Sequence, residues 1–359
     1  MRSKKKGAVG LDKIAIINQL KRTVNEIFHD LFLKKSDYYE PFCPSTSANY
    51  NRSRNQCGAV GSVKELIERL GLASVLKLVT EHAINLPSRN IIEDEVSDGQ
   101  QNIDFMEVHL EEDTRCLVYD DFGVRRKWVE LMDAMEHEAY LEIPYVEPVG
   151  LAEALKVRVI SKGPPLLYSH FKPLQKLLHT TLRQLKVFQL IGTPVSEGII
   201  NATFSKKPSP DDIFLNGDYK ASTDNLRSWV SEAIGNELID ILNKNAAVSR
   251  DLGKIINKEM FIRSLTGHVF IMEDGTEKPQ LDGQLMGSIT SFPILCLANA
   301  ALCRWALELA NGQAYRLTDF PNATHEIKTY PCPLLVNGDD CTMMGNRELL
   351  RTLWSKITQ

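Results

Sequence analysis

The clearest hydrophobic patterns lie in the middle and the last part of the chain. From Phe171 onwards, apolar residues in FKPLQKLLHTTLRQLKVFQLIG recur at helical spacing and predict an amphipathic helix. The segment 155–160, LKVRVI, alternates apolar with basic residues, which is the pattern of a β-strand. The run FPILCLANAALCRWALELA predicts a long apolar helix, with Pro293 tolerated in its first turn. The polar segment 41–62 predicts a long loop that ends in Ser62 as a helix cap.

Turn residues between apolar runs mark two hairpins. In HVFIMEDGTEKPQLDG the dipeptide Asp274-Gly275 separates two short strands, and this dipeptide favours a tight two-residue turn. In PLLVNGDDCTMMG, the triplet 338–340 separates two apolar strands. The order along the chain is strand and helix, hairpin, helix, hairpin and helix. This alternation predicts an α+β fold, in which a mixed sheet carries helices on one face.

Charge is distributed unevenly over a chain of ordinary globular composition. The 359 residues are 43% hydrophobic and 25% charged, with a net charge of -4, which excludes a protein that is basic overall. Residues 93–147 contain 17 acidic and 4 basic side chains, and we expect a surface insertion there. Residues 151–200 contain 7 basic and 2 acidic side chains, which indicates a focused anion site.

Cysteines and long apolar runs limit the cellular setting. The seven cysteines form no CxxC pair, and their number is odd, so a reducing intracellular compartment is expected. The basic start MRSKKKGAVG lacks the apolar core of a signal peptide. We predict no membrane span, because no stretch approaches about 18 uninterrupted apolar residues. The sequence does not indicate an oligomeric state.

Two separated groups of aspartates are the candidate metal ligands. Asp218 is expected to end a strand, where its carboxylate can point beyond the sheet edge, and Asp224 to begin the next helix. Taken alone, Asp218 can equally be a turn residue at a strand end or a metal ligand. Asp224, taken alone, can be simply the N-cap of the helix. The adjacent Asp339 and Asp340 repel each other unless a cation offsets their charge, and their hard oxygens suit Mg²⁺ or Mn²⁺. If Asp218 and Asp339 come from neighbouring strands, they can flank two ions about 3.5–4 Å apart.

Basic and small polar residues form two further candidate blocks. Lys156 and Arg158 lie two apart on the predicted strand and therefore on one face, and Lys162 follows at a turn. Such cations suit a triphosphate, although a solvated strand face has the same pattern.

The second of these blocks is GQLMGSITS. Gly283 and Gly287 allow unusual backbone dihedrals, and Ser288, Thr290 and Ser291 bring hydroxyl groups to a helix start. A loop of this kind can hold a nucleic-acid backbone or a ribose hydroxyl. A plain helix-capping loop is the alternative.

Taken in order, four blocks resemble motifs of viral RNA-dependent RNA polymerases: LKVRVISKG, GDYKASTD, GQLMGSITSFPILCLAN and NGDDC. The residues of these four blocks are most similar to those of the ourmia-like (botourmiavirus) branch, near narnaviruses and mitoviruses. The resemblance implies a right-hand polymerase fold with an antiparallel palm sheet backed by helices. It divides the chain into 1–150, an N-terminal extension with part of the fingers, 151–210, fingers with the basic motif, and 211–359, the palm.

The same resemblance assigns roles to single residues. Asp218, Asp339 and Asp340 would be catalytic and bind Mg²⁺, with Mn²⁺ possible, and Asp224 would sense the ribose 2′-hydroxyl. The expected nucleotide-binding residues are Lys156, Arg158, Lys162, Asp224, Ser288 and Thr290. The expected RNA-binding residues are Gly283, Gly287, Ser291 and Asn299.

The implied function is RNA-directed RNA polymerase, replicating a viral RNA genome by two-metal nucleotidyl transfer. Its partners would be the RNA template, the product strand and ribonucleoside triphosphates, in the cytoplasm of a host such as a fungus or in its mitochondria. Two departures from the motifs matter. FPILCL is apolar where many such polymerases have a polar residue, and only 18 residues follow Cys341. We therefore expect the lysine-bearing palm motif and the thumb to be missing, and the chain alone to be weak or inactive.

Three other functions use similar residues. A reverse transcriptase has the same palm and metals, but its hairpin usually carries an aromatic residue where this chain has Asn337, and its sugar site excludes the hydroxyl that Asp224 favours. A non-catalytic RNA-binding fragment with an inactive palm would not need the intact aspartates. A two-metal nuclease would need a further Asp, Glu or His cluster, which the motifs do not contain.

Overall fold

The protein forms two compact units in this computed structural model. The structure describes residues 13–31, 44, 47–72, 122–152, 154, 157–204, 210–248, 256–319 and 328–358. The first unit comprises 1–33, 176–258 and 292–359, and the second comprises 34–175 and 259–291. Each unit is therefore assembled from separated segments of the chain. The division into N-terminal part, fingers and palm at residues 150 and 210 stays a prediction.

Helices and strands both contribute to each unit, so the predicted α+β class is confirmed. In the first unit the elements are α1 (Lys13–Phe28), η2 (Lys186–Phe188), α9 (Glu197–Thr203), β3 (Asp212–Gly217), α10 (Ser222–Asn225), α11 (Ser228–Val248), β6 (Tyr315–Arg316), β7 (Tyr330–Pro331), β8 (Leu334–Asn337), β9 (Asp340–Asn346) and α14 (Arg347–Thr358). In the second they are η1 (Arg54–Gln56), α3 (Gly58–Arg69), α6 (Phe122–Leu141), β1 (Tyr145–Ala152), β2 (Val157–Lys162), α7 (Pro165–His170), β4 (Val269–Ile271) and β5 (Glu277–Pro279). Three helices carry the chain from one unit to the other: α8 (Lys172–Arg183), α12 (Lys258–Thr266) and α13 (Ser291–Asn311).

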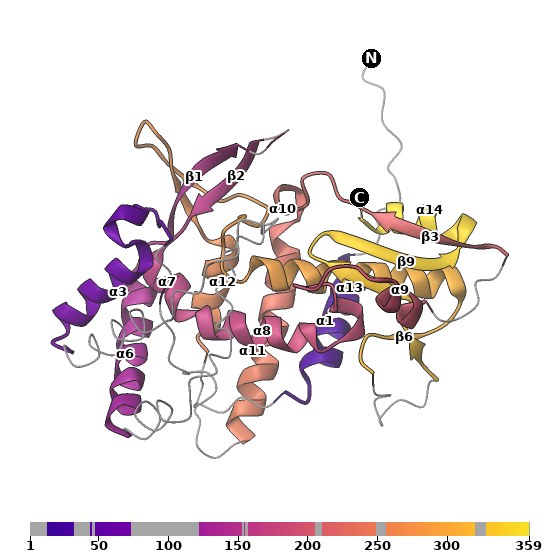
Figure 1. The fold of residues 1–359 in the computed structure, drawn as a ribbon, viewed down its shortest axis with the longest axis horizontal. Coiled ribbons are helices and arrows are strands. Elements are labelled where there is room, and N and C mark those ends of the chain that lie inside the picture. Colours follow the sequence, from indigo (N-terminus) through magenta and orange to yellow (C-terminus); the bar gives the residue numbers. More distant parts are fainter. Residues whose placement is uncertain are drawn as a thin grey trace. The chain divides into compact units, whose positions relative to one another are not determined.

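A three-stranded antiparallel sheet with the order β3-β9-β8 is the centre of the first unit. The predicted hairpin of β8 and β9 is confirmed, and the β8 residues Leu334, Leu335 and Val336 are buried. Helix α13 lies against this sheet (Figure 1): a Cβ atom on Gly345 of β9 would meet the side chain of Leu307 of α13 at 3.3 Å. The long apolar helix predicted from the sequence is thus a core helix.

Helix α13 is long and apolar enough, by length and composition, to cross a membrane. In the described part of the chain it is the single helix with this property, and 67% of its most apolar window is buried inside the protein. A core helix of a globular unit passes the same test, and the contacts of α13 with the sheet account for its apolar composition.

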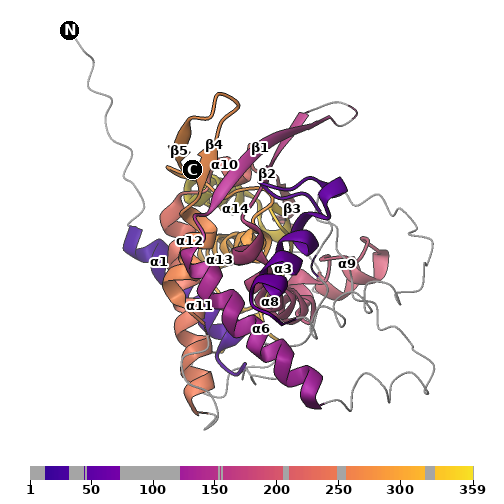
Figure 2. The ribbon, with the colours of Figure 1, turned by 90° about the vertical axis from the view of Figure 1, so that its left-hand side faces the viewer.

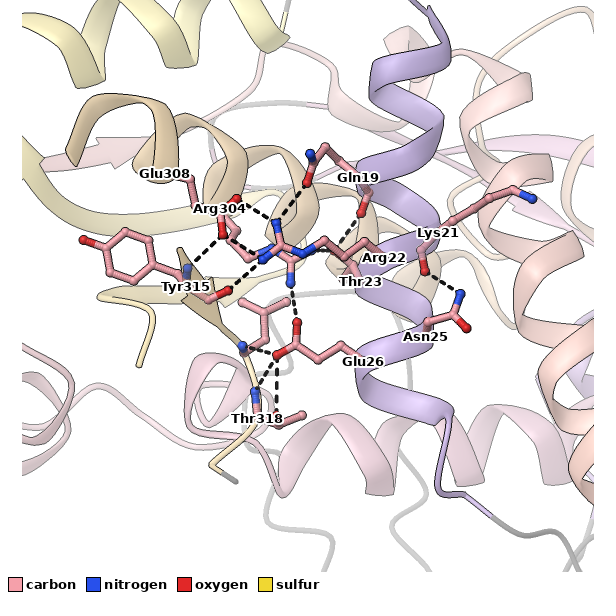
Figure 3. A network of polar contacts seen from close by, with 11 residues as sticks. Gln19, Lys21, Arg22, Thr23, Asn25, Glu26, Arg304, Glu308, Tyr315 and Thr318 are labelled. Carbon is pink, nitrogen blue, oxygen red and sulfur yellow. Dashed lines mark hydrogen bonds and ion pairs between the residues drawn. The ribbon is translucent and has the colours of Figure 1, made fainter. Parts of the chain in front are cut away.

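Helix α1 lies beside α11 and is tied to α13 by buried and half-buried polar contacts (Figures 2 and 3). The guanidinium of Arg22 makes two hydrogen bonds to the carboxylate of Glu308, at 2.7 and 2.8 Å, and donates to the carbonyl oxygen of Tyr315 at 3.1 Å. One helical turn further along α1, the carboxylate of Glu26 forms an ion pair with the guanidinium of Arg304. The N-terminal helix is therefore part of the core of the first unit.

The second unit contains a mixed four-stranded sheet with the order β2-β1-β4-β5. Strand β1 pairs antiparallel with β2 and parallel with β4, and Figure 2 shows the resulting pair of hairpins. The predicted hairpin of β4 and β5 is confirmed, with Gly275 at a φ of 79° in its turn. The predicted strand 155–160 is found two residues later, as β2, and residues 155 and 156 lie outside the described part of the chain.

The predicted cap of the helix after residue 62 is wrong. Helix α3 begins at Gly58, so Ser62 lies inside it, buried, and its hydroxyl accepts a hydrogen bond from the side chain of Asn49 at 3.2 Å. The helix has a different N-cap residue. Cys57, with a φ of 64°, holds the cap position instead, so the helix starts five residues earlier than predicted.

Candidate functional site

Strands β8 and β9 are joined by the two-residue turn Gly338-Asp339, across which Asn337 pairs with Asp340. Gly338 has a φ of 64°, in the left-handed region that favours glycine. A Cβ atom there would also lie 3.1 Å from the ring of Phe292. The glycine of the triplet thus makes the turn, Asp339 lies in it half-buried, and Asp340 opens β9 with an exposed side chain.

Strand β3 brings Asp218 to the same end of the sheet. The last pair in the register joins Gly217 to Cys341, so Asp218 and Asp340 are the next residues on neighbouring strands. Directly opposed residues of an antiparallel pair have Cβ atoms about 4.5–5.5 Å apart. Asp218, directly after β3, and Asp339, directly before β9, thus lie at the same end of two neighbouring strands, which is the condition that the sequence left open.

Glycine is needed at position 217 for a steric reason. A Cβ atom there would lie 2.5 Å from the indole of Trp354 and 2.7 Å from the Sγ atom of Cys341. Trp354 belongs to α14, which contacts β3. Gly217 therefore lets α14 close on the strand end that leads to Asp218.

The carboxylate of Asp339 is held by a hydroxyl from the segment that follows β3. Ser222, the first residue of α10, donates from its Oγ atom to Oδ2 of Asp339 at 2.6 Å. Asp224 is the third residue of α10 and is exposed. The interpretation of Asp224 as an N-cap is wrong, because Ala221 holds the cap position with a φ of 49°.

The backbone of the acidic turn is held by Asn299 of α13. Its Nδ2 atom lies 3.0 Å from the carbonyl oxygen of Gly338, 2.9 Å from that of Asp339 and 3.4 Å from that of Asp340. Asn299 is 3% exposed. This burial argues against the predicted RNA contact of Asn299, because its polar atoms already face the protein.

Tyr219 completes the contacts of that amide. Its hydroxyl donates to Oδ1 of Asn299 at 3.0 Å, and the thiol of Cys303 donates to the same oxygen at 3.1 Å. Burial is the main reason that the pKa of Tyr219 is raised, so its hydroxyl keeps its proton. The ring of Tyr219 lies against that of Trp354, with centroids 5.3 Å apart. No sequence pattern identified Tyr219, although it adjoins Asp218.

The three carboxylates fit Mg²⁺ or Mn²⁺ by the chemistry of their donors, since both ions prefer hard oxygen ligands. The register also fits, because it aligns like charges on neighbouring strands, and a cation would offset them. Among the described residues, no three His, Cys, Asp or Glu side chains converge as a metal site does. The fit therefore rests on donor chemistry and on register.

In the second unit, the basic strand and the glycine loop come together. The backbone N–H of Ser161 donates to the carbonyl oxygen of Met286 at 2.8 Å. Gly287 has a φ of 112°, and a Cβ atom there would lie 2.5 Å from the carbonyl oxygen of Ser161. Two blocks that are 120 residues apart in sequence thus meet at the end of β2, and the glycine is required at this contact.

The basic residues of β2 are only partly available to a ligand. Lys162 forms an ion pair of 3.1 Å with Glu147, its partner in the register with β1. Arg158 is half-buried on the same strand, and Lys156 lies outside the described residues. Glu147 therefore offsets one of the charges that the sequence assigns to nucleotide binding.

The hydroxyl groups of the glycine loop are buried. Ser288 donates to the carbonyl oxygen of Ser264 at 3.0 Å, and Ser291 donates to those of Leu285 and Ser288 at 2.8 and 3.0 Å. Thr290 has no exposed surface. This arrangement favours the alternative of a loop that caps its own helix, because the predicted ligand-binding hydroxyls face the protein interior.

Gly283, where φ is 83°, is held by a series of hydrogen bonds between side chains of the second unit. Gln280 donates from Nε2 to the carbonyl oxygen of Gly283 at 2.9 Å. Its Oε1 lies 2.8 Å from Nδ1 of His268 and can only accept, so Nδ1 carries the proton. Nε2 of His268 then accepts from the hydroxyl of Tyr168 at 2.9 Å. Burial lowers the pKa of His268 to about 4, which keeps this ring neutral. No sequence signal marked Tyr168, His268 or Gln280.

Comparison with known proteins shows that the chain is similar to a curated viral protein and, more distantly, to solved structures. No protein family profile matches the chain. Over 200 residues, the chain is 31% identical to the RNA-dependent RNA polymerase of Ourmia melon virus, a match that covers 52% of this chain and 21% of that polymerase. The match thus spans about a fifth of the length of that relative.

Two solved structures resemble the chain more distantly. The RNA-dependent RNA polymerase of a human picorbirnavirus superposes with a TM-score of 0.42 at 15% identity, over 60% of this chain and 38% of that one. Its insertion-loop deletion mutant gives a TM-score of 0.44 at 14% identity, over 60% and 40% of the two chains.

Proposed function

We propose that the chain is part of a viral RNA-directed RNA polymerase of the ourmia-like branch. The observation that carries the proposal is the pairing of β3 with β9, which sets Asp218 beside Asp340, the first residue of β9, and close to the turn that contains Asp339. The 31% identity to the polymerase of Ourmia melon virus supports it. We further propose that the first unit, which contains this sheet, is the palm. The proposed location of the protein is the host cytoplasm.

The proposed reaction joins a ribonucleotide to the 3′ end of an RNA strand. The 3′-hydroxyl loses its proton and attacks the α-phosphate of a ribonucleoside triphosphate, so that a new P–O bond forms and pyrophosphate leaves. Asp218 and Asp339 would hold divalent ions, with Asp340 in support, and such ions activate the hydroxyl and offset charge on the leaving group. Ser222 would orient the carboxylate of Asp339.

The test is extension of a primed RNA template by one labelled nucleotide, with Asp339→Ala beside the wild-type chain. We use single-nucleotide incorporation because we propose that the 359-residue chain alone is weak. Loss of a metal-binding carboxylate should lower incorporation at least about a hundredfold. Asp240→Ala is the matched control, because Asp240 is exposed and pairs only with Lys258 among the described side chains.

The same assay tests the choice of sugar. We propose that Asp224, exposed on α10, favours the ribose 2′-hydroxyl, so ribonucleotides should be incorporated in preference to deoxyribonucleotides. Incorporation by Asp339→Ala at the wild-type rate would remove the assignment of the acidic turn. A preference for deoxyribonucleotides would replace the proposed activity with that of a reverse transcriptase.

A further inference from the structure

A single buried side chain, Asn299, contacts every backbone carbonyl of the acidic segment 338–340. The amide nitrogen of Asn299 contacts three successive carbonyl oxygens, those of Gly338, Asp339 and Asp340, at 2.9–3.4 Å. An amide nitrogen carries two hydrogens, so two strong bonds and one longer contact use its full capacity. Because Asn299 is 3% exposed, water does not compete for these contacts, and hydrogen bonds in such surroundings are stronger than in solvent.

The orientation of this amide is fixed from its other end. Oδ1 of Asn299 accepts from Tyr219 and from Cys303 at 3.0 and 3.1 Å. If the amide were turned over, its oxygen would face three carbonyl oxygens, which cannot donate. The hydroxyl and the thiol therefore select the orientation that presents the donor to the turn.

The same contacts connect Asp218 with the turn that carries Asp339. Tyr219 is bonded through the backbone to Asp218, and its hydroxyl reaches the residue that holds the turn of Asp339. Cys296, one turn earlier on the same face of α13, accepts from the backbone N–H of Gly338 at 3.3 Å. One face of α13 thus supports the acidic turn directly and, through Tyr219, is joined to the end of β3.

We propose that Asn299, oriented by Tyr219, is a positioning residue that sets the acidic turn relative to Asp218, so that both strands can share one divalent cation. The inference rests on the proposed function, because it concerns the same acidic group. It gives Asn299 a role that differs from contact with RNA. Residues that orient metal ligands without touching the ion typically change metal affinity 10–100-fold when they are removed.

The test measures Mn²⁺ binding to the 359-residue chain, without RNA or nucleotide, from the electron paramagnetic resonance signal of free Mn²⁺. The component lost in Asp339→Ala defines binding at the acidic turn. Asn299→Ala should weaken this component by about 10–100-fold. Circular dichroism and thermal unfolding report separately whether each variant is folded.

Asn311→Ala is the matched control on the same helix. Asn311 is also an asparagine of α13 with two contacts, donating to the hydroxyl of Tyr315 at 2.8 Å and accepting from the backbone of Asn346 at 3.1 Å. Its loss should lower the melting temperature and leave Mn²⁺ affinity within about twofold. Equal losses of affinity in both variants would show a merely structural role and overturn the proposal, as would wild-type affinity in folded Asn299→Ala.

Tyr219→Phe keeps the test decisive if Asn299→Ala does not fold. This variant removes one hydroxyl and leaves the ring against Trp354 in place. We expect Mn²⁺ affinity to fall by several-fold, and unchanged affinity would overturn the proposal. If the wild-type chain has no component that Asp339→Ala removes, the proposed metal site itself fails. If that component is present and insensitive to position 299, only the positioning role fails.

Discussion

Arg304 of α13 and Glu26 of α1 form an ion pair that is almost completely removed from solvent, with side chains 0% and 9% exposed. The pair lies in a fuller network (Figure 3). Arg304 also donates to the hydroxyl of Thr23 at 2.7 Å, and Glu26 accepts from the backbone N–H of Thr318 at 3.2 Å. Charges buried in this way depend on each other, because neither has water to replace its partner.

Glu26→Ala should therefore lower the free energy of unfolding by about 3–5 kcal/mol, since it leaves the buried guanidinium of Arg304 without its counter-charge. Urea unfolding followed by tryptophan fluorescence measures this change. The reporters suit the experiment, because three of the four tryptophans lie in the first unit: Trp229, Trp305 and Trp354.

An exposed ion pair of the same unit is the control. Asp240 and Lys258 lie 2.7 Å apart, with side chains 61% and 36% exposed. Asp240→Ala should change the free energy of unfolding by less than about 1 kcal/mol, because solvent screens such a pair. If both variants lose the same stability, burial is not what makes the Glu26 pair important.

Gly287→Ala should destabilise the second unit more than Gly275→Ala does. Both glycines have positive φ, 112° and 79°, but an added Cβ would lie 2.5 Å from a backbone carbonyl at Gly287 and would meet nothing within 4 Å at Gly275. We expect a loss of about 1 kcal/mol from backbone strain at Gly275 and a clearly larger loss at Gly287. Unfolding followed at Trp128, buried in this unit, gives both values, and equal losses would show that the contact with β2 is unimportant.

Glu142 should make the second unit less stable as the pH rises from about 5 to about 7. Burial is the largest cause that raises the pKa of this carboxyl from 4.5 to about 7, while the backbone N–H groups of Leu166 and Leu167, which donate to it, oppose the shift. Between these two pKa values the folded state binds more protons than the unfolded state. Stability from this group is therefore full below pH 4.5 and lost towards pH 7.

Glu142→Gln should remove this part of the pH dependence, because the amide keeps an acceptor oxygen and does not titrate. The measurement is urea unfolding at several pH values between 4.5 and 7.5, followed at Trp128. A slope that is equal in wild type and Glu142→Gln would contradict the assignment.

Local features of the fold followed from the sequence. The hairpins at Asp274-Gly275 and at Gly338 were predictable because a turn residue with positive φ stands between short strands in each. The helix from residue 172 was predictable for a similar reason, since Leu174, Leu178 and Leu182 recur on one buried face. In all of these, the residues that decide the structure are neighbours in the chain.

Long-range contacts could not be predicted in this way. The pairing of β3 with β9 joins residues 124 to 134 positions apart, and only the resemblance of the motifs pointed to it. No local signal indicates that Asn299, on an apolar helix, meets a turn 39 residues later. Similarly, hydroxyl groups at Ser288 and Ser291 indicate a polar loop, but the sequence does not say whether they face a ligand or the interior.

The contact between α1 and α13 sets the order in which the first unit can fold during synthesis. Glu26 and Arg304 are 278 residues apart, and ribosomes add roughly 5–20 residues per second, so α1 leaves the ribosome about 14 to 56 seconds before its partner is made. During this interval Arg22 of α1 also lacks Glu308, the carboxylate to which it donates. The buried polar contacts of α1 with α13 can therefore form only after residue 308 has been translated, whereas α11, which α1 lies beside, is made about 60 residues earlier.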